Sequence, residues 1–263
     1  VGRADREAKW DASQADDPAE PIWQSSLHHD GRTTVLTMPS WVTWRTKWDW
    51  EGWLRGEIGR VIGDGTSGLV FDLRGNEGGT TLGDDMIPFL IQQPIALAPL
   101  QTYVAYRSVP EELQPFIETY DDSVLAIGKD AQPAENGLFA LASQKDRVIS
   151  PGPASFGGKI AIIVGPDNSS ATFSFARAMQ DAGRAMLVGE PSGGNMRGIN
   201  GGAYLFARLP DSGIEFDIPA IGYYFDQNLP DRGLLPDFAA PQTPASIAGE
   251  RDVALEAALE AVA

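Results

Sequence analysis

Short apolar runs that end in glycine-rich turns are the main pattern along this chain of 263 residues. Residues 69–73 (LVFDL) and 160–164 (IAIIV) are nearly continuous apolar runs, as expected for strands buried on both faces. A third run at 185–189 follows a segment with helical spacing at 170–182. Strand, turn, helix and strand in this order predict parallel strands joined by crossover helices. The sequence therefore predicts an α/β fold with a mixed β-sheet flanked by helices.

Other elements are predicted around these strands. Residues 33–38 (TTVLTM) alternate in the manner of a strand. Apolar residues at spacings of three and four predict an amphipathic helix over 49–62. The remaining expected elements are a strand over 101–106, helices over 82–92 and 252–262, and a hairpin of strands 203–208 and 214–218.

Composition divides the chain into three parts. Residues 1–32 form a polar lead-in, which we expect to be loosely ordered or disordered. Residues 33–245 form the predicted catalytic core, with an elaboration at about 93–150 that is either a surface excursion or a lid over a cleft. Residues 246–263 hold the C-terminal helix.

Charge and residue content exclude several classes of function. A net charge of −16 argues against binding to nucleic acid or to an anionic membrane. The absence of cysteine removes disulfides, thiolate zinc sites and a cysteine nucleophile, and we expect neither a metal site nor a cofactor. No apolar run is long enough to predict a membrane span, and no signal peptide is visible. Because the chain opens at Val1 without Met, we expect a mature or trimmed form.

Candidate chemistry lies in three turns that follow apolar strands, at 74–80, 165–171 and 189–198. Ligands of open α/β sheets bind beyond the carboxyl ends of the strands, so these turns are the expected site. Ser169 and Ser170 stand where a helix begins. A serine there is either a helix N-cap or a nucleophile beside N–H groups that stabilise an oxyanion.

Four segments around these turns form an ordered set. Residues 69–79 read as an apolar strand followed by Asp-Leu-Arg-x-Asn-x-Gly-Gly, and Ser169-Ser170-Ala171 opens the helix. The segment 187–194 follows as strand and loop, and 233–237 (GLLPD) reads as Gly-x-x-Pro-Asp. In this order and spacing, the set resembles the tail-specific (C-terminal processing) serine proteases, peptidase family S41. The resemblance covers most of residues 65–240.

The resemblance implies a ClpP/crotonase-like core and assigns roles to residues. Ser170 falls on the nucleophile, one oxyanion N–H falls on Ala171, and the other falls on the Gly78-Gly79 pair, where glycine permits a close backbone approach. The resemblance also implies an exported bacterial protein, periplasmic or extracellular, that acts on a peptide or protein substrate. Supporting roles, at the site or toward substrate, fall on Asp72, Arg74, Asn76, Glu190, Asn195 and Arg197. For Asp72 and Arg74 we favour an ion pair or turn brace over direct chemistry.

The general base is the point at which the sequence departs from the Ser-Lys branch of the family. The position of that lysine, 25 residues after the serine, is occupied by Asn195, whose amide cannot accept the proton. Arg197 stays protonated. The PDZ domain common in the family also has no counterpart in this sequence.

The chain is more similar to the lysine-less branch of tricorn-type peptidases and retinoid carriers. That branch implies a histidine base, and the candidates are His28 and His29, which otherwise form an exposed pair. The carboxylate partner stays open among Glu190, Asp231 and Asp237. A base in a preceding segment outside this chain is a further possibility.

We therefore predict a serine peptidase, of endopeptidase or C-terminal processing type, that forms an acyl-enzyme on Ser170. The alternative is a catalytically inactive relative that binds peptides or apolar small molecules. The tryptophans at 41–53 would suit such a ligand site, although packing within the core explains them equally. A crotonase-like acyl-CoA enzyme is more distant, because no basic patch for CoA phosphates is evident.

Overall fold

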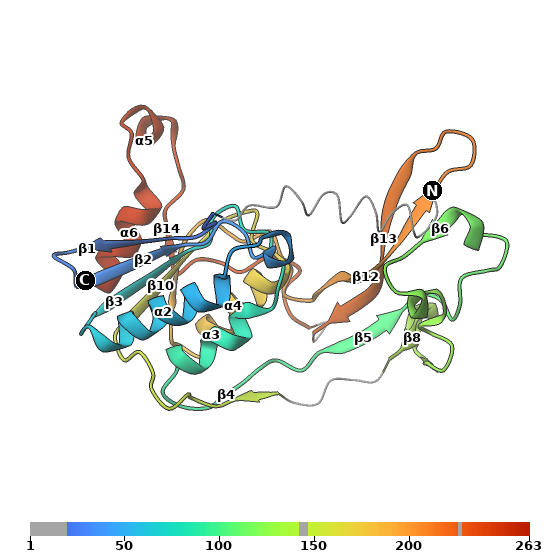
Figure 1. Ribbon diagram of the computed structural model, residues 1–263, viewed down its shortest axis with the longest axis horizontal. Coiled ribbons are helices and arrows are strands. Elements are labelled where there is room, and N and C mark those ends of the chain that lie inside the picture. The colour runs from blue at the N-terminus through green and yellow to red at the C-terminus, as the bar shows by residue number, and fades with distance from the viewer. Residues whose placement is uncertain (1–19, 142–146, 226–227) are drawn as a thin grey trace. The chain divides into compact units, whose positions relative to one another are not determined.

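The computed structural model describes residues 20–141, 147–225 and 228–263 (Figure 1). The described residues fall into two units. The core unit holds residues 20–97, 148–195 and 232–263. The hairpin unit holds residues 98–141, 147, 196–225 and 228–231. It therefore combines residues from the predicted elaboration at about 93–150 with a later segment of the chain.

Six strands of the core unit form one sheet, in the order β1, β2, β3, β10, β11, β14 (Figure 1). The strands are β1 Gln24–His28, β2 Thr33–Thr37, β3 Gly68–Asp72, β10 Lys159–Val164, β11 Met186–Gly189 and β14 Phe238–Ala239. Neighbours from β2 to β14 run parallel, whereas β1 pairs antiparallel with β2 at one edge. The sheet is therefore mixed, which confirms the predicted α/β architecture.

Helices cover both faces of this sheet. Val70 of β3 lies in an apolar cluster with Val262 of α6 (Val253–Val262) on one face. The next residue, Phe71, packs against Phe175 of α4 (Ser170–Asp181) on the other face, with ring centroids 5.5 Å apart. Successive side chains of a strand point to opposite faces, so β3 is buried on both. This two-sided burial explains the continuous apolar runs in the sequence.

Two further helices of the core unit lie close to their predicted positions. Helix α2 spans Trp50–Gly63 and α3 spans Leu82–Leu90. Helix α3 ends before the predicted residue 92, because the backbone is already extended at Ile91. The remaining elements are η1 Thr43–Arg45, β4 Ile95–Ala96, β9 Val148–Ile149 and α5 Pro244–Ala248.

A long antiparallel hairpin of β12 (Gly198–Arg208) and β13 (Glu215–Tyr224) is the main feature of the hairpin unit. The predicted hairpin is confirmed and is longer than expected. Its pairing continues past a register shift between Gly201 and Tyr204. Glycines in that part of β12 interrupt the alternation of apolar and polar residues, so the sequence pattern indicates only part of the strand. The other elements are β5 Gln101–Val104, η2 Gln114–Phe116, β6 Ile117–Glu118, η3 Asp122–Ala126, β7 Gln132–Pro133, η4 Glu135–Gly137 and β8 Phe139–Ala140.

The segment before β2 differs from the expected lead-in over residues 1–32. Strand β1 occupies the sheet edge, and Trp23 just before it is only 1% exposed. The indole Nε1 of Trp23 donates to the Ser40 carbonyl at 2.7 Å. Its ring centroid lies 5.3 to 6.0 Å from those of Trp48, Trp50 and Trp53. One buried ring therefore anchors a strand whose own residues are mostly polar; residues 1–19 lie outside the described part.

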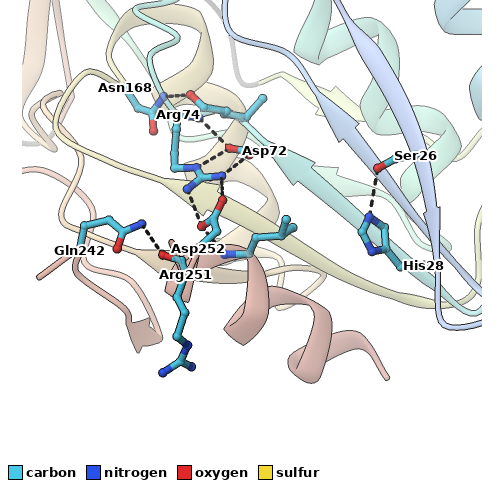
Figure 2. Close-up of polar contacts among 10 residues, drawn as sticks. Ser26, His28, Asp72, Arg74, Asn168, Gln242, Arg251 and Asp252 are labelled. Atoms are coloured by element: carbon cyan, nitrogen blue, oxygen red, sulfur yellow. Dashed lines mark hydrogen bonds and ion pairs between the residues drawn. The ribbon is translucent and has the colours of Figure 1, made fainter. Parts of the chain in front are cut away.

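Arg74 joins the loop after β3 to the start of α6 (Figure 2). Its Nε donates to Asp72 Oδ1 at 2.8 Å, and its Nη2 donates to Asp72 Oδ2 at 2.5 Å. Its Nη1 and Nη2 also donate to Asp252 Oδ1 and Oδ2, both at 2.7 Å. Asp252 is the N-cap of α6, where it accepts the Leu255 N–H at 3.1 Å. The guanidinium thus makes two bidentate contacts that tie the helix to the loop.

These contacts shift the pKa of both partners. The hydrogen bond to Asp72, together with those to Asp252, raises the pKa of Arg74 although partial burial opposes the change. For Asp252, burial is the largest single influence and raises the pKa, but hydrogen bonds from Arg74 and the Leu255 N–H outweigh it, so the net pKa is lowered. A lowered folded-state pKa stabilises the fold above the unfolded pKa, and the stabilisation is lost as pH falls through the folded value.

We predict that Trp23→Ala lowers the free energy of unfolding by about 3–5 kcal/mol, because it leaves a cavity among packed rings. Denaturant unfolding followed by circular dichroism measures the change. Trp44→Ala is the matched control, since Trp44 is 51% exposed; its cost should stay near 0.5 kcal/mol, as an order of magnitude for surface sites. Equal losses would contradict a core role for the Trp23 cluster.

We predict that Asp252→Asn lowers the free energy of unfolding by about 1 kcal/mol at pH 7, the order of a partly exposed ion pair. Asparagine keeps a capping oxygen, so the change isolates the charge. The difference from wild type should shrink once pH falls below the ordinary aspartate pKa of about 3.9, and it should vanish below the lowered folded-state pKa, where wild-type Asp252 is protonated. Thermal unfolding at several pH values, with the exposed Asp211→Asn as control, tests this. A difference that persists in acid would contradict it.

Candidate active site

The loops after β3, β10 and β11 open at one edge of the core-unit sheet. These three strands are parallel neighbours, so their carboxyl ends meet at that edge. The loops comprise residues 73–81, 165–169 and 190–195. They contain most of the three turns in which the sequence placed the site. Residues 170 and 171 begin α4, Gly189 ends β11, and residues 196–198 belong to the hairpin unit.

Ser170 is the first residue of α4 and directly follows the turn after β10. Its φ of +49° lies in the left-handed region, which non-glycine residues adopt rarely and at a cost. The side chain is exposed. The preceding Ser169 holds the N-cap position, but its hydroxyl donates to the Glu77 carbonyl at 2.9 Å and does not cap the helix. Ser170 is thus an exposed serine with a strained backbone, on a turn that leads from a strand into a helix.

Gly78 packs directly against Ser170. A Cβ added to Gly78 would lie 2.9 Å from the Ser170 Cβ and 3.0 Å from the Ala171 nitrogen. The φ angles of Gly78 and Gly79 are +108° and +136°, which glycine alone adopts without strain. The structure therefore brings Gly78, Ser170 and Ala171 together, although they come from loops after two different strands.

Backbone N–H groups around Ser170 differ in their availability. The Gly78 N–H donates to Asn76 Oδ1 at 3.0 Å, so that donor is occupied. Within the described residues, the N–H groups of Gly79 and Ala171 have no hydrogen-bond partner. Ala171 lies in the first turn of α4, where the helix dipole adds positive potential. Of the Gly78-Gly79 pair, Gly79 is therefore the member whose N–H is unbonded within the described residues.

The two histidines lie at the opposite edge of the sheet. His28 is in register with Thr33, and Thr33 with Gly68, at the amino ends of β2 and β3. Ser170 lies beyond the carboxyl ends, so roughly 16 Å of strand separates them, at about 3.3 Å per residue. The ring of His28 contacts the Ser26 hydroxyl at 3.1 Å, away from the Arg74 contacts (Figure 2).

His29 is also engaged at that edge. It has a φ of +51° in the turn after β1, and its Nδ1 lies 3.2 Å from Thr33 Oγ1. The expectation that His28 or His29 supplies the base is therefore corrected, because a hairpin register fixes both at the amino edge. No hydrogen bond in the described parts of the chain joins the Ser170 hydroxyl to any other side chain.

The other core-unit residues singled out from the sequence have structural contacts. Arg74 binds both Asp72 and Asp252, in the role of a turn brace. Asp237 accepts the Leu187 N–H at 2.7 Å and so braces β11. Glu190 is half-buried at the end of β11, and its N–H donates to the Val164 carbonyl at 3.1 Å.

The last expected residues divide between the two units. Asn195 is half-buried at the end of the third loop, in the core unit. Arg197 belongs to the hairpin unit, where its Nε donates to the Leu229 carbonyl at 2.7 Å. Its Nη1 also lies 3.4 Å from Asp231, one of the candidate carboxylates.

Two residues at the site were missed by sequence reasoning. Asn168 is 1% exposed, and its side-chain amide bonds to the loops after both β3 and β10. Thr172 is fully buried, and its hydroxyl lies 3.0 Å from the Asn76 carbonyl and 2.7 Å from that of Ser169. Both are short polar residues beside the Ser-Ser pair. That placement next to the candidate nucleophile was the available signal, but their burial is visible only in three dimensions.

Across the ranges that the structure describes, no three His, Asp or Glu side chains gather in a way that would hold a metal ion. None of the described helices has both the length and the apolar character that crossing a bilayer would take.

Comparisons with known proteins add the family. The family model of Peptidase family S41 matches residues 32–239. No curated protein matches the sequence. Among solved structures, a candidate peptidase of Parabacteroides merdae ATCC 43184 aligns with a TM-score of 0.59 and 16% identity, over 97% of this chain and 69% of that one.

Two further structures have the same fold. Mature CPAF in complex with lactacystin gives a TM-score of 0.57 and 16% identity, over 90% of this chain and 53% of that one. A candidate S41 protease of Bacteroides fragilis NCTC 9343 gives 0.50 and 12%, over 90% and 56%. The chain thus spans only about half the length of these two proteins. The structures show a shared fold, and the match over residues 32–239 shows that this chain belongs to peptidase family S41.

Proposed function

We propose that this chain is a serine peptidase that forms an acyl-enzyme on Ser170. The observation that carries the proposal is the left-handed φ of Ser170, at the exposed start of α4 and in contact with Gly78. Strained backbone persists only where its surroundings hold it in place, and it is concentrated at active sites. Membership of peptidase family S41 supports a peptide or protein as the substrate.

In the proposed reaction, Ser170 Oγ bonds to the carbonyl carbon of the peptide while its proton passes to a base. The carbonyl oxygen takes up negative charge and accepts hydrogen bonds from the Gly79 and Ala171 N–H groups. The C–N bond then breaks, and the amine leaves with the transferred proton. Water hydrolyses the resulting ester, which releases the acid and restores the Ser170 hydroxyl.

The proposed base is a group other than His28, His29 and Arg74. His28 and His29 lie at the far edge of the sheet, and the raised pKa of Arg74 keeps its guanidinium protonated. Two parts of the proposal rest on family analogy alone. One is export to the periplasm or the exterior, and the other is the type of cleavage, endopeptidase or C-terminal processing.

We predict that a fluorophosphonate probe labels the wild-type chain at Ser170, as mapped by peptide mass spectrometry. Ser170→Ala should reduce labelling to background, because the attacking oxygen is gone. The double variant His28→Gln, His29→Gln should label like the wild type, since both side chains lie at the amino edge. Labelling of another serine would refute the nucleophile assignment. An unlabelled wild type that binds peptides or quenches tryptophan fluorescence with apolar ligands would favour the binding-protein alternative.

We predict that Gly78→Ala slows labelling about 100-fold or more, the order of a lost oxyanion donor. The added Cβ would displace Ser170 and the Ala171 N–H. Gly75→Ala is the matched control on the same loop, because Gly75 also has a positive φ of +75° but an added Cβ there meets no atom within 4 Å. Time courses of labelling compare the two. Equal slowing would show that backbone strain, and not the contact with Ser170, causes the effect.

A further inference from the structure

Asn168 connects the loops after three neighbouring strands. Its Nδ2 donates to the Leu73 carbonyl at 2.5 Å and to the Asn76 carbonyl at 2.9 Å, both after β3. Its Oδ1 accepts the Gly165 N–H at 2.7 Å, within its own loop after β10. Its backbone carbonyl accepts the Gly194 N–H at 2.9 Å, from the loop after β11. One buried residue therefore fixes the relative positions of all three loops.

Asn76 continues this connection to Gly78. Its side chain is fully buried, with Nδ2 donating to the Met38 carbonyl at 2.7 Å and Oδ1 accepting the Gly78 N–H at 3.0 Å. The backbone carbonyl of the same residue accepts from Asn168. Asn168 therefore holds the residue that orients Gly78, and Gly78 is the residue that packs on Ser170.

The chemistry of the amide makes Asn168 hard to replace. Two carbonyl oxygens face its NH₂ group and one N–H faces its oxygen, so donors and acceptor are all used. An aspartate has the same shape, but it would set a carboxylate oxygen against two carbonyl oxygens. The geometry thus requires a group that donates twice and accepts once, and among side chains of this size only the asparagine amide does so.

We infer that Asn168 is the positioning residue that sets Gly78 and Gly79 against Ser170, and so aligns the oxyanion donors with the nucleophile. The expected effect of Asn168 on the rate of reaction at Ser170 rests on the proposed function, whereas its expected effect on the position of the loops does not. Asn168 itself touches neither the substrate nor Ser170 Oγ; it acts through the backbone of residues 73–79 and 165–170.

The test compares Asn168→Asp and Asn168→Ala with Arg184→Ala as the matched control. Arg184 also joins separate segments of the core unit, because its Nε donates to the Leu90 carbonyl at 2.5 Å and its Nη2 to the Phe156 carbonyl at 2.6 Å, but it lies before β11 and away from the three loops. With a fluorophosphonate probe, both Asn168 variants should lower the maximal labelling rate about 100-fold, the order expected for a displacement near 1 Å. The probe concentration for half-maximal rate should stay the same. The control should keep the wild-type rate whatever its stability.

Amide hydrogen exchange tests the same inference without activity. Asn168→Ala should speed exchange over both 73–81 and 165–171. Asn168→Asp should speed it over 73–81 but keep Gly165 protected, because its retained oxygen still accepts that N–H. Unchanged exchange over 73–81 in both variants would overturn the inference. So would a wild-type labelling rate in either variant. If the wild type is not labelled at all, the proposed function fails, and exchange alone decides whether Asn168 sets the loops.

Discussion

The candidate site depends on how closely the backbone after β3 approaches the backbone after β10. An added methyl group at Gly78 would lie within 3.0 Å of both the Ser170 Cβ and the Ala171 nitrogen, so the two segments meet with no side chain between them. That approach has two requirements. The strands must be parallel neighbours, and the loops must be held without bulky groups. The paired strands satisfy the first, and the buried amides of Asn76 and Asn168 satisfy the second.

The contact also explains why the conformation of Ser170 is tolerated. A left-handed serine costs free energy locally, on the order of 1–3 kcal/mol. Its neighbours on both sides are fixed, since the Ser169 hydroxyl and Thr172 hydroxyl bond to backbone carbonyls of Glu77 and Asn76. These bonds come from α4 to the loop after β3, so the same contacts that join the two loops also keep the serine in its strained geometry.

Sequence reasoning identified the parts of the fold that are governed by local pattern. The two-sided burial of β3 and β10 is visible as continuous apolar runs, and the glycines at 78 and 79 and the Ser-Ser pair are visible as turn chemistry. What it missed depends on contacts between distant residues. Three features belong to this group: the anchoring of β1 by Trp23, the burial of Asn168 and the placement of the histidines by strand register. No periodic pattern in the sequence indicates them, because each is set by a partner elsewhere in the chain.

Helix α6 lies outside the residues 32–239 that match the family, yet it covers one face of the sheet and binds Arg74 at the site loop. The part of this chain that is recognisable by sequence similarity is therefore smaller than the part that must fold together. A fragment cut at residue 239 would leave Val35, Val70 and Ile163 facing solvent, and Arg74 without one of its two carboxylates. Expression of the domain should therefore be planned from packing, so that α6 is included, and not from where the family resemblance stops.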